Sequence, residues 1–370
     1  MQQSYYRNGF VLIGLLLVTF LAGTAIAKDY NGALDFLFFG RQPSAKAEAM
    51  GKSMVANGVD AFAAFYNPAS ISQNKGLVLS TSYASPYYLA NKANFKFIGA
   101  TYKLDKYGVL GLSLYRFSFG SPIFITTETG PDATNETFTP TTSMYSLTFS
   151  TETFKDLFVG LNFNFVRDKT VVTGKSYPID FGLLKVFRFK KNGRTFQRIT
   201  LGASLYNITN SSIEYNFDQR TPTKEVLPRT LHIGASYQSS FGKSQLNSIE
   251  LNTFGILLQV EYQDLLNSKF HNGFKAGAEF SFIEMFYLRF GFYDENTNDF
   301  GFPATNKNRL TDFTYGFGIE IPINKFTKTR TPIDIKLDMT NMKQPSGIKG
   351  FDNFGNFSVY SLSVNWQFKN

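Results

Sequence analysis

The sequence has 370 residues, with 41 Phe, 20 Tyr and no Cys, and only 18% of its residues are charged. Such an aromatic chain can bury enough surface to fold, so a disordered protein is excluded. The absence of Cys excludes a disulfide scaffold, a zinc ribbon and a thiol enzyme. The formal net charge is +9, but the basic residues are scattered along the chain. We therefore expect no nucleic-acid partner.

The N-terminal residues resemble an export signal. Arg7 is the only charged residue before Lys28, and an apolar stretch at residues 10–22 is followed by the small-residue pattern Ala25-Ile26-Ala27. This order is typical of a secretory signal peptide. We predict that residues 1–27 are a cleaved signal peptide. A membrane anchor is the alternative, although a spanning helix needs about 20 apolar residues.

Residues 28–76 show no strand-like alternation. Residues 42–51 are rich in Ala and favour a short helix, and Asn67-Pro68 favours a turn. A small-residue segment before the first strand would fit inside a wide barrel as a hatch. We predict a hatch over residues 28–76, in which the candidate binding residues are Phe62, Phe65, Tyr66, Asn67, Pro68 and Ala69.

The rest of the chain, residues 77–370, alternates between apolar and polar side chains. In the last segment Tyr360, Leu362 and Val364 share one face, and Ser361 and Ser363 share the other. This period of two is typical of strands with one apolar face. About fourteen such segments begin near Leu77, Ala93, Tyr107, Thr142, Leu157, Tyr177, Arg198, Arg229, Phe254, Gly273, Phe286, Asp312, Pro332 and Asn356.

The strand number and the connections favour a membrane barrel. Long polar connections, such as residues 118–141 and 209–228, tend to alternate with short ones, such as residues 104–106 and 283–285. This asymmetry is typical of outer-membrane barrels. One connection, residues 239–253, is longer than the pattern requires. We predict an all-β chain, a transmembrane antiparallel β-barrel of about fourteen strands with an N-terminal luminal hatch, in contact with outer-membrane lipid. A soluble sandwich is the alternative, because alternation does not distinguish inside from outside.

Several motifs resemble the FadL-like outer-membrane β-barrel superfamily and its PorV/PorQ relatives of the type IX secretion system of Bacteroidota. The motifs are Met50-Gly51, Asp60, Asn67-Pro68-Ala69, the run from Leu227 to Tyr237 and the run from Tyr287 to Phe292. The resemblance implies a fourteen-stranded barrel filled by an N-terminal hatch. It also implies two possible functions. FadL-type members carry hydrophobic compounds, and PorV/PorQ-type members assist protein export.

The length and residues 42–50 resemble the PorV/PorQ branch more closely. The predicted inward faces are also rich in charge, which suits clamping a hatch better than an apolar conduit. We predict an accessory of type IX protein secretion and surface attachment, with the translocon and exported cargo proteins as partners. The alternative is passive transport of long-chain fatty acids or other hydrophobic small molecules. The inward-facing charges are Asp180, His232, Glu261, Lys275, Glu279, Arg289, Glu320, Asp334, Lys336 and Asp338.

Catalytic motifs are weak. The sequence has no Gly-x-Ser-x-Gly elbow, and its three Gly-Lys-Ser tripeptides lack the earlier Gly of a phosphate loop. It has two His, His232 and His271, and no cluster with metal-ligand spacing. We predict no enzyme activity, no cofactor and no metal. A lipid-modifying barrel enzyme is a third hypothesis, which requires a Ser or His within hydrogen-bond range of a luminal carboxylate.

Overall fold

Most of the predicted barrel and hatch can be described in the computed structural model. The predicted signal peptide, the first part of the predicted hatch and His271 lie outside the described residues. The described residues are 40–86, 92–120, 122–126, 133–170, 172–191, 195–216, 222–246, 249–267, 272–296, 309–323, 333–342 and 356–367.

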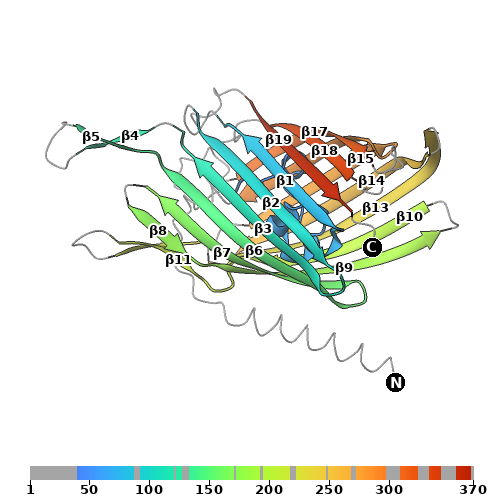
Figure 1. Ribbon diagram of the computed structural model, residues 1–370, viewed down its shortest axis with the longest axis horizontal. Helices are drawn as coiled ribbons and strands as arrows, with labels where there is room; N and C mark the ends of the chain where they lie inside the picture. Colours follow the sequence, from blue (N-terminus) through green and yellow to red (C-terminus); the bar gives the residue numbers. More distant parts are fainter. Residues whose placement is uncertain are drawn as a thin grey trace, which may run out of the picture.

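Fourteen of the described strands form a closed antiparallel barrel (Figure 1). The first strand pairs with the second on one side and with the last on the other, so the sheet closes on itself. This confirms the predicted barrel and excludes the sandwich. The strands are β1 (Leu77–Ala84), β2 (Asn94–Leu104), β3 (Gly108–Ser118), β6 (Thr141–Phe154), β7 (Leu157–Lys169), β9 (Ile179–Lys191), β10 (Thr195–Leu205), β13 (Thr230–Leu246), β14 (Ile249–Leu265), β15 (Asn272–Phe282), β16 (Phe286–Asn296), β17 (Arg309–Pro322), β18 (Ile333–Met342) and β19 (Phe357–Trp366).

The two ends of the barrel differ. At the short-turn end, β2 and β3 are joined by residues 105–107, and β6 and β7 by residues 155–156. Asp105 and Asp156 in these turns have φ of 44° and 59°, which a short Asp side chain tolerates better than most. At the opposite, long-loop end, β3 and β6 are separated by residues 119–140. The chain therefore has the loop asymmetry that the sequence predicts.

Residues 239–253 are the main correction to the predicted strands. The sequence suggests a long connection here, whereas β13 and β14 stay paired from Thr230↔Leu265 to Leu246↔Ile249. Lys243 and Glu250 form an ion pair between the two strands. This part of the hairpin is mainly polar, with isolated apolar residues such as Phe241 and Leu251, so the hydrophobic alternation is lost although the strands continue.

Further strands lie at the long-loop end, in residues that the sequence assigns to loops. A separate hairpin is formed by β4 (Ile123–Thr126) and β5 (Ala133–Phe138). The other three strands extend the barrel sheet next to β7, and the Tyr215 hydroxyl donates a 2.9 Å hydrogen bond to Asp168 there. They are β8 (Thr173–Ser176), β11 (Ser212–Tyr215) and β12 (Thr223–Val226).

The exterior of the barrel is apolar and the interior is polar over much of the wall. On β17, Phe313, Tyr315 and Phe317 are 70%, 50% and 50% exposed, whereas Asp312 and Thr314, which flank Phe313, are buried. The apolar face of the alternation therefore points outward. An outward apolar band over a polar interior is the arrangement of a barrel that faces hydrocarbon.

Residues 40–76 lie inside the barrel and are called the hatch below (Figure 1). They form α2 (Ala45–Ala49), α3 (Ala63–Tyr66) and the 3₁₀ helix η2 (Pro68–Gln73). The Ser44 hydroxyl caps α2, and the Asn67 side chain caps η2 ahead of Pro68, an arrangement favoured at helix starts. Among the described residues, no helix is long and apolar enough to cross a membrane.

Candidate functional site

Inward-facing glycines surround the hatch where it meets the wall. A Cβ atom at Gly291 would lie 2.0 Å from the amide nitrogen of Gly51, and one at Gly182 would lie 2.1 Å from Oδ1 of Asn67. Glycine in a strand often marks such a close backbone approach. These two and five further glycines in contact with the hatch are called the glycine belt. The further members are Gly160, Gly202, Gly234, Gly277 and Gly316.

A buried ion-pair network holds the hatch on the long-loop side of the belt. Glu261 lies at its centre, because its Oε2 accepts a 2.9 Å hydrogen bond from the Val55 amide and its Oε1 lies 3.5 Å from Nζ of Lys275. Lys52 of the hatch pairs with Glu295 at 3.0 Å. We call Glu261, Lys275, Glu295 and Lys52 the upper clamp.

A second network lies on the short-turn side of the belt. Lys46 of α2 lies 3.4 Å from Glu279, and Arg289 pairs with Glu279 at 2.6 Å and with Asp338 at 2.8 Å. Burial lowers the pKa of Lys46, and the nearby Glu279 opposes this shift. We call these four residues the lower clamp. Together the clamps make β14–β18 a charged wall that binds the hatch, as the inward charges predicted by the sequence suggested.

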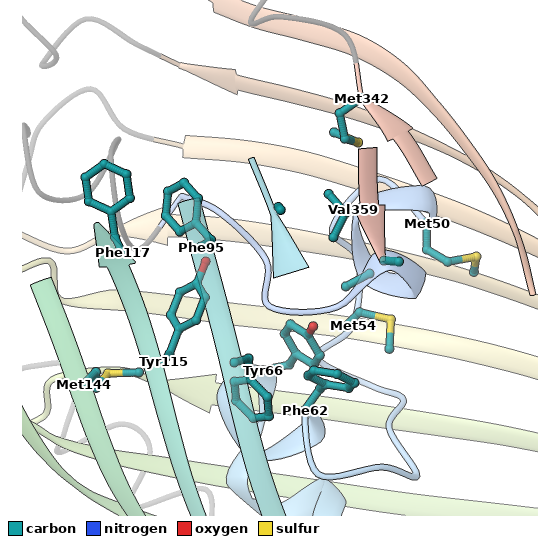
Figure 2. Packing of buried hydrophobic residues seen from close by; sticks show 14 of the residues in the cluster. Met50, Met54, Phe62, Tyr66, Phe95, Tyr115, Phe117, Met144, Met342 and Val359 are labelled. Carbon is teal, nitrogen blue, oxygen red and sulfur yellow. The ribbon is translucent and has the colours of Figure 1, made fainter. Parts of the chain in front are cut away.

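The opposite wall is aromatic. Phe95 and Phe97 of β2 and Tyr115 and Phe117 of β3 point inward and are buried, and we call them the aromatic wall. Ring centroids are 4.7 Å apart between Phe95 and Phe117 and 6.0 Å apart between Phe95 and Tyr115. Figure 2 shows the rings of Phe95, Tyr115 and Phe117 near the ends of β2 and β3, on the side of the hatch residues Phe62 and Tyr66. The sequence did not reveal this wall, because both faces of β2 and β3 carry large apolar residues.

A cavity lies on the long-loop side of the hatch, between the charged wall and strands β6, β7 and β9. Its apolar lining includes Met54, Phe65 and Tyr66 of the hatch, together with Met144 and Leu227 of the barrel. Its polar lining includes all four members of the upper clamp and further side chains. These polar residues are Lys52, Asn162, Asn164, Asp180, His232, Glu261, Lys275 and Glu295. The cavity can therefore hold an apolar group beside hydrogen-bonding groups.

The six predicted binding residues separate into three places. Phe65 and Tyr66 line the cavity, and the Tyr66 hydroxyl donates a 3.0 Å hydrogen bond to Ser44. Burial raises the pKa of Tyr66 well above its ordinary value, so this hydroxyl stays a neutral donor. Phe62 instead packs on Phe97, with ring centroids 4.7 Å apart.

The other three predicted residues face the belt. Asn67, Pro68 and Ala69 contact Gly160 and Gly182, and they are outside the cavity lining. The Asn67 amide donates hydrogen bonds of 2.8 Å to the Val55 carbonyl and 2.9 Å to the Leu183 carbonyl. Their contacts are those of a structural anchor.

One luminal histidine has the contact that the enzyme hypothesis requires. His232 Nδ1 lies 2.8 Å from Oε1 of Glu261, and the Tyr206 ring packs on the imidazole at 4.6 Å. No serine or threonine hydroxyl within the described part of the chain hydrogen-bonds to this ring, and no group of three His, Asp or Glu residues there is arranged for a metal ion. His232 thus contributes to the structure around the upper clamp.

Comparisons with known proteins show that this chain is similar to several solved structures. No family model matches the sequence, and no curated protein does. The toluene transporter TodX of Pseudomonas putida is 12% identical over 88% of this chain and 98% of its own, with a TM-score of 0.44. A FadL homologue of Pseudomonas aeruginosa is 10% identical over 89% of this chain and 99% of its own, with a TM-score of 0.43. The CymD monoaromatic hydrocarbon channel has 12% identity, coverages of 88% and 98% and a TM-score of 0.44.

Proposed function

We propose that this protein is an outer-membrane barrel that conducts hydrophobic small molecules, such as long-chain fatty acids or aromatic compounds, without a chemical step. The observation that carries the proposal is the aromatic wall, which packs through Tyr115 on Phe65 of the hatch, itself part of the cavity lining. Sites for such ligands combine buried apolar side chains with polar groups that fix the orientation of the ligand.

The proposed orientation follows from the barrel itself. The exposed apolar band would face the hydrocarbon of the membrane, and the long-loop end would face outside, as in other barrels of this kind. The short-turn end, where β1 begins and β19 ends, would face the periplasm. Export to this membrane is consistent with the predicted signal peptide.

The luminal charges are compatible with a hydrophobic ligand. In the sequence analysis, the inward charges favoured a clamp for the hatch over an apolar conduit. In the structure, the charged residues and the aromatic residues lie on different walls of the barrel. Lys275, Glu279 and Arg289 belong to the clamps on β15 and β16, whereas Tyr115 and Phe117 belong to β3. One side of the lumen can thus hold the hatch while the other guides an apolar molecule.

An uptake assay tests the proposal. Cells that lack their own channels for such compounds would express the wild-type chain, Phe65→Ala or the outward-facing control Phe317→Ala, and would be given radiolabelled oleate or toluene. We expect faster uptake with the wild type and the control than with Phe65→Ala. Uptake by the wild type no faster than by cells without the protein would contradict the proposal.

A second candidate function is the predicted accessory role in type IX secretion. One feature favours it, because β8, β11 and β12 add a protruding sheet and β4–β5 adds a hairpin at the long-loop end (Figure 1). These elements would offer a surface to exported cargo or to the translocon. A deletion strain of the source organism that exports and anchors its surface proteins normally would exclude this role.

A further inference from the structure

We propose that the exterior of the barrel binds a phosphate-bearing lipid of the outer leaflet, at a site formed by strands β2, β3, β6, β7 and β8. The site joins a row of cations to an apolar groove next to it on the same strands. It is separate from the lumen, so it does not depend on which molecule the lumen conducts. It does rest on the proposed orientation, which places the long-loop end in the outer leaflet.

Four exposed, outward-facing cations lie on neighbouring strands near the long-loop end (Figure 1). Each is two residues from the end of its strand on that side. Lys96 is paired with Arg116 in the register of β2 and β3, and Arg167 is paired with Lys175 in the register of β7 and β8. Ser143 of β6 joins the two pairs, because it is paired with Arg116 on one side and with Arg167 on the other. We call the four cations the basic row.

The basic row places like charges directly opposite each other, which destabilises a sheet. Within the described part of the chain, none of its four side chains forms an ion pair. Glu214 follows Lys175 in the register, but its ion pair is with Lys224. On β17, by contrast, exposed Arg309 pairs with Asp294 at 2.7 Å. A local cost without compensation is expected at a functional site, and here an anionic ligand would supply the missing charge.

The spacing of the cations favours a ligand with more than one anionic group. Neighbouring strands lie about 4.8 Å apart, so the basic row extends over about 20 Å of the surface. A single phosphate ion would reach only one of the two like-charge pairs, whereas a headgroup with two phosphates could reach both. Arg116 and Arg167 supply one guanidinium to each pair, and a guanidinium binds phosphate through two parallel hydrogen bonds.

An apolar groove adjoins the basic row on the side of the membrane. Two residues further along the same strands, about 7 Å away, the outward side chains include Tyr145 and Phe165, whose stacked ring centroids are 5.9 Å apart. Aromatic side chains at this level are typical of the boundary between headgroups and hydrocarbon. Below them the groove can receive acyl chains, and we call it the outer groove. Its outward lining includes Leu79, Ile98, Ala100, Leu112, Leu147 and Phe163.

The combination of cations and groove is confined to one side of the barrel. On β14 and β16 the outward residues near the long-loop end are Asp264 and Asp294, which would repel a phosphate. General contact with lipid would not require such an asymmetry. Clusters of Lys and Arg beside a membrane-facing surface are typical of sites for anionic lipid headgroups. A phosphorylated glycolipid with several acyl chains, such as lipid A, meets both the basic row and the outer groove.

Native mass spectrometry of the full-length mature protein, refolded in neutral detergent, tests the basic row with purified lipid A as the probe. Arg116→Gln/Arg167→Gln should weaken binding roughly 25-fold, since each cation beside such a surface contributes about fivefold. The matched control is Arg188→Gln/Lys243→Gln, which removes two partly exposed cations near the short-turn end and should bind like the wild type. Equal binding by the two double variants, or equal binding of dephosphorylated lipid A by the wild type, would overturn the phosphate site.

A groove-filling variant tests where the acyl chains lie. Ala100 is the small residue between Leu79 and Leu112 in the register of the outer groove, so Ala100→Trp should weaken lipid A binding several-fold. The matched control is Ala235→Trp, which places the same side chain in a different exterior groove on β13. Heat-modifiable migration on gels confirms that each variant has folded. Equal affinity of the two Trp variants would overturn the outer groove as the acyl-chain site.

Discussion

The glycine belt makes a quantitative prediction for Gly291→Ala. The new Cβ would lie 2.0 Å from the Gly51 nitrogen and 2.4 Å from the Met50 carbonyl carbon, although real Cβ contacts stay above 3.0 Å. Both neighbours are backbone atoms, so the hatch itself must shift. Overpacking of this kind costs about 1–3 kcal/mol, which corresponds to a roughly 5- to 150-fold larger population of the displaced hatch.

Hydrogen exchange of the hatch measures this effect. In nanodiscs, the amides of residues 44–56 in Gly291→Ala should exchange faster by the same factor, while the amides of β15 and β16 stay protected. The matched control is Gly255→Ala on β14, whose Cβ would have the flexible Ser281 side chain and the Ser239 carbonyl as its nearest neighbours. Equal hatch protection in the two variants would refute the close packing inferred from the glycine belt.

Two further variants test the clamps and the apolar band. Glu261→Ala should destabilise the hatch by about 3–5 kcal/mol, because it leaves buried Lys275 with one fewer partner, whereas Glu250→Ala in the exposed Lys243 pair should cost at most about 1 kcal/mol. Limited proteolysis of the hatch at increasing denaturant compares the two, and equal midpoints would exclude a special role for Glu261. Phe317→Arg should cost about 2–4 kcal/mol of folding free energy in vesicles, because it places a charge in the apolar band. Denaturant titrations of folding in vesicles compare Phe317→Arg with the control Phe317→Leu. Equal stability of the two variants would place Phe317 outside the membrane.

Much of the barrel is predictable from alternation. Strand starts predicted at Leu77, Leu157 and Phe286 are the observed ones, since one face of each strand must be apolar and the other polar. Strands are not recognised in the sequence where they lack this contrast between an apolar and a polar face. In residues 239–253 the few apolar residues, such as Phe241 and Leu251, form no regular alternation, so only the backbone pairing shows this part as strands. The hairpin of β4 and β5 lacks alternation for the opposite reason, because Ile123, Phe124 and Ile125 are consecutive apolar residues.

The site is less predictable than the fold. Alternation could not show which face points inward, and Phe95 and Tyr115 were overlooked because Ile98 and Leu112 make the opposite face of their strands apolar too. The belt is also invisible in sequence, because a strand glycine such as Gly291 shows no preference for a partner. The candidate residues were chosen as one stretch, whereas a turn at Asn67 separates the cavity residues from the anchor residues.

Photoaffinity labelling tests the central claim most directly. A radiolabelled, photoreactive fatty acid would be cross-linked to the protein in nanodiscs and the labelled residues mapped by mass spectrometry. The proposed conduction predicts labelling of Phe95, Tyr115 and Phe65 that excess unlabelled oleate displaces. Labelling confined to outward residues such as Phe313, unaffected by competitor, would show that the lumen does not receive hydrophobic molecules.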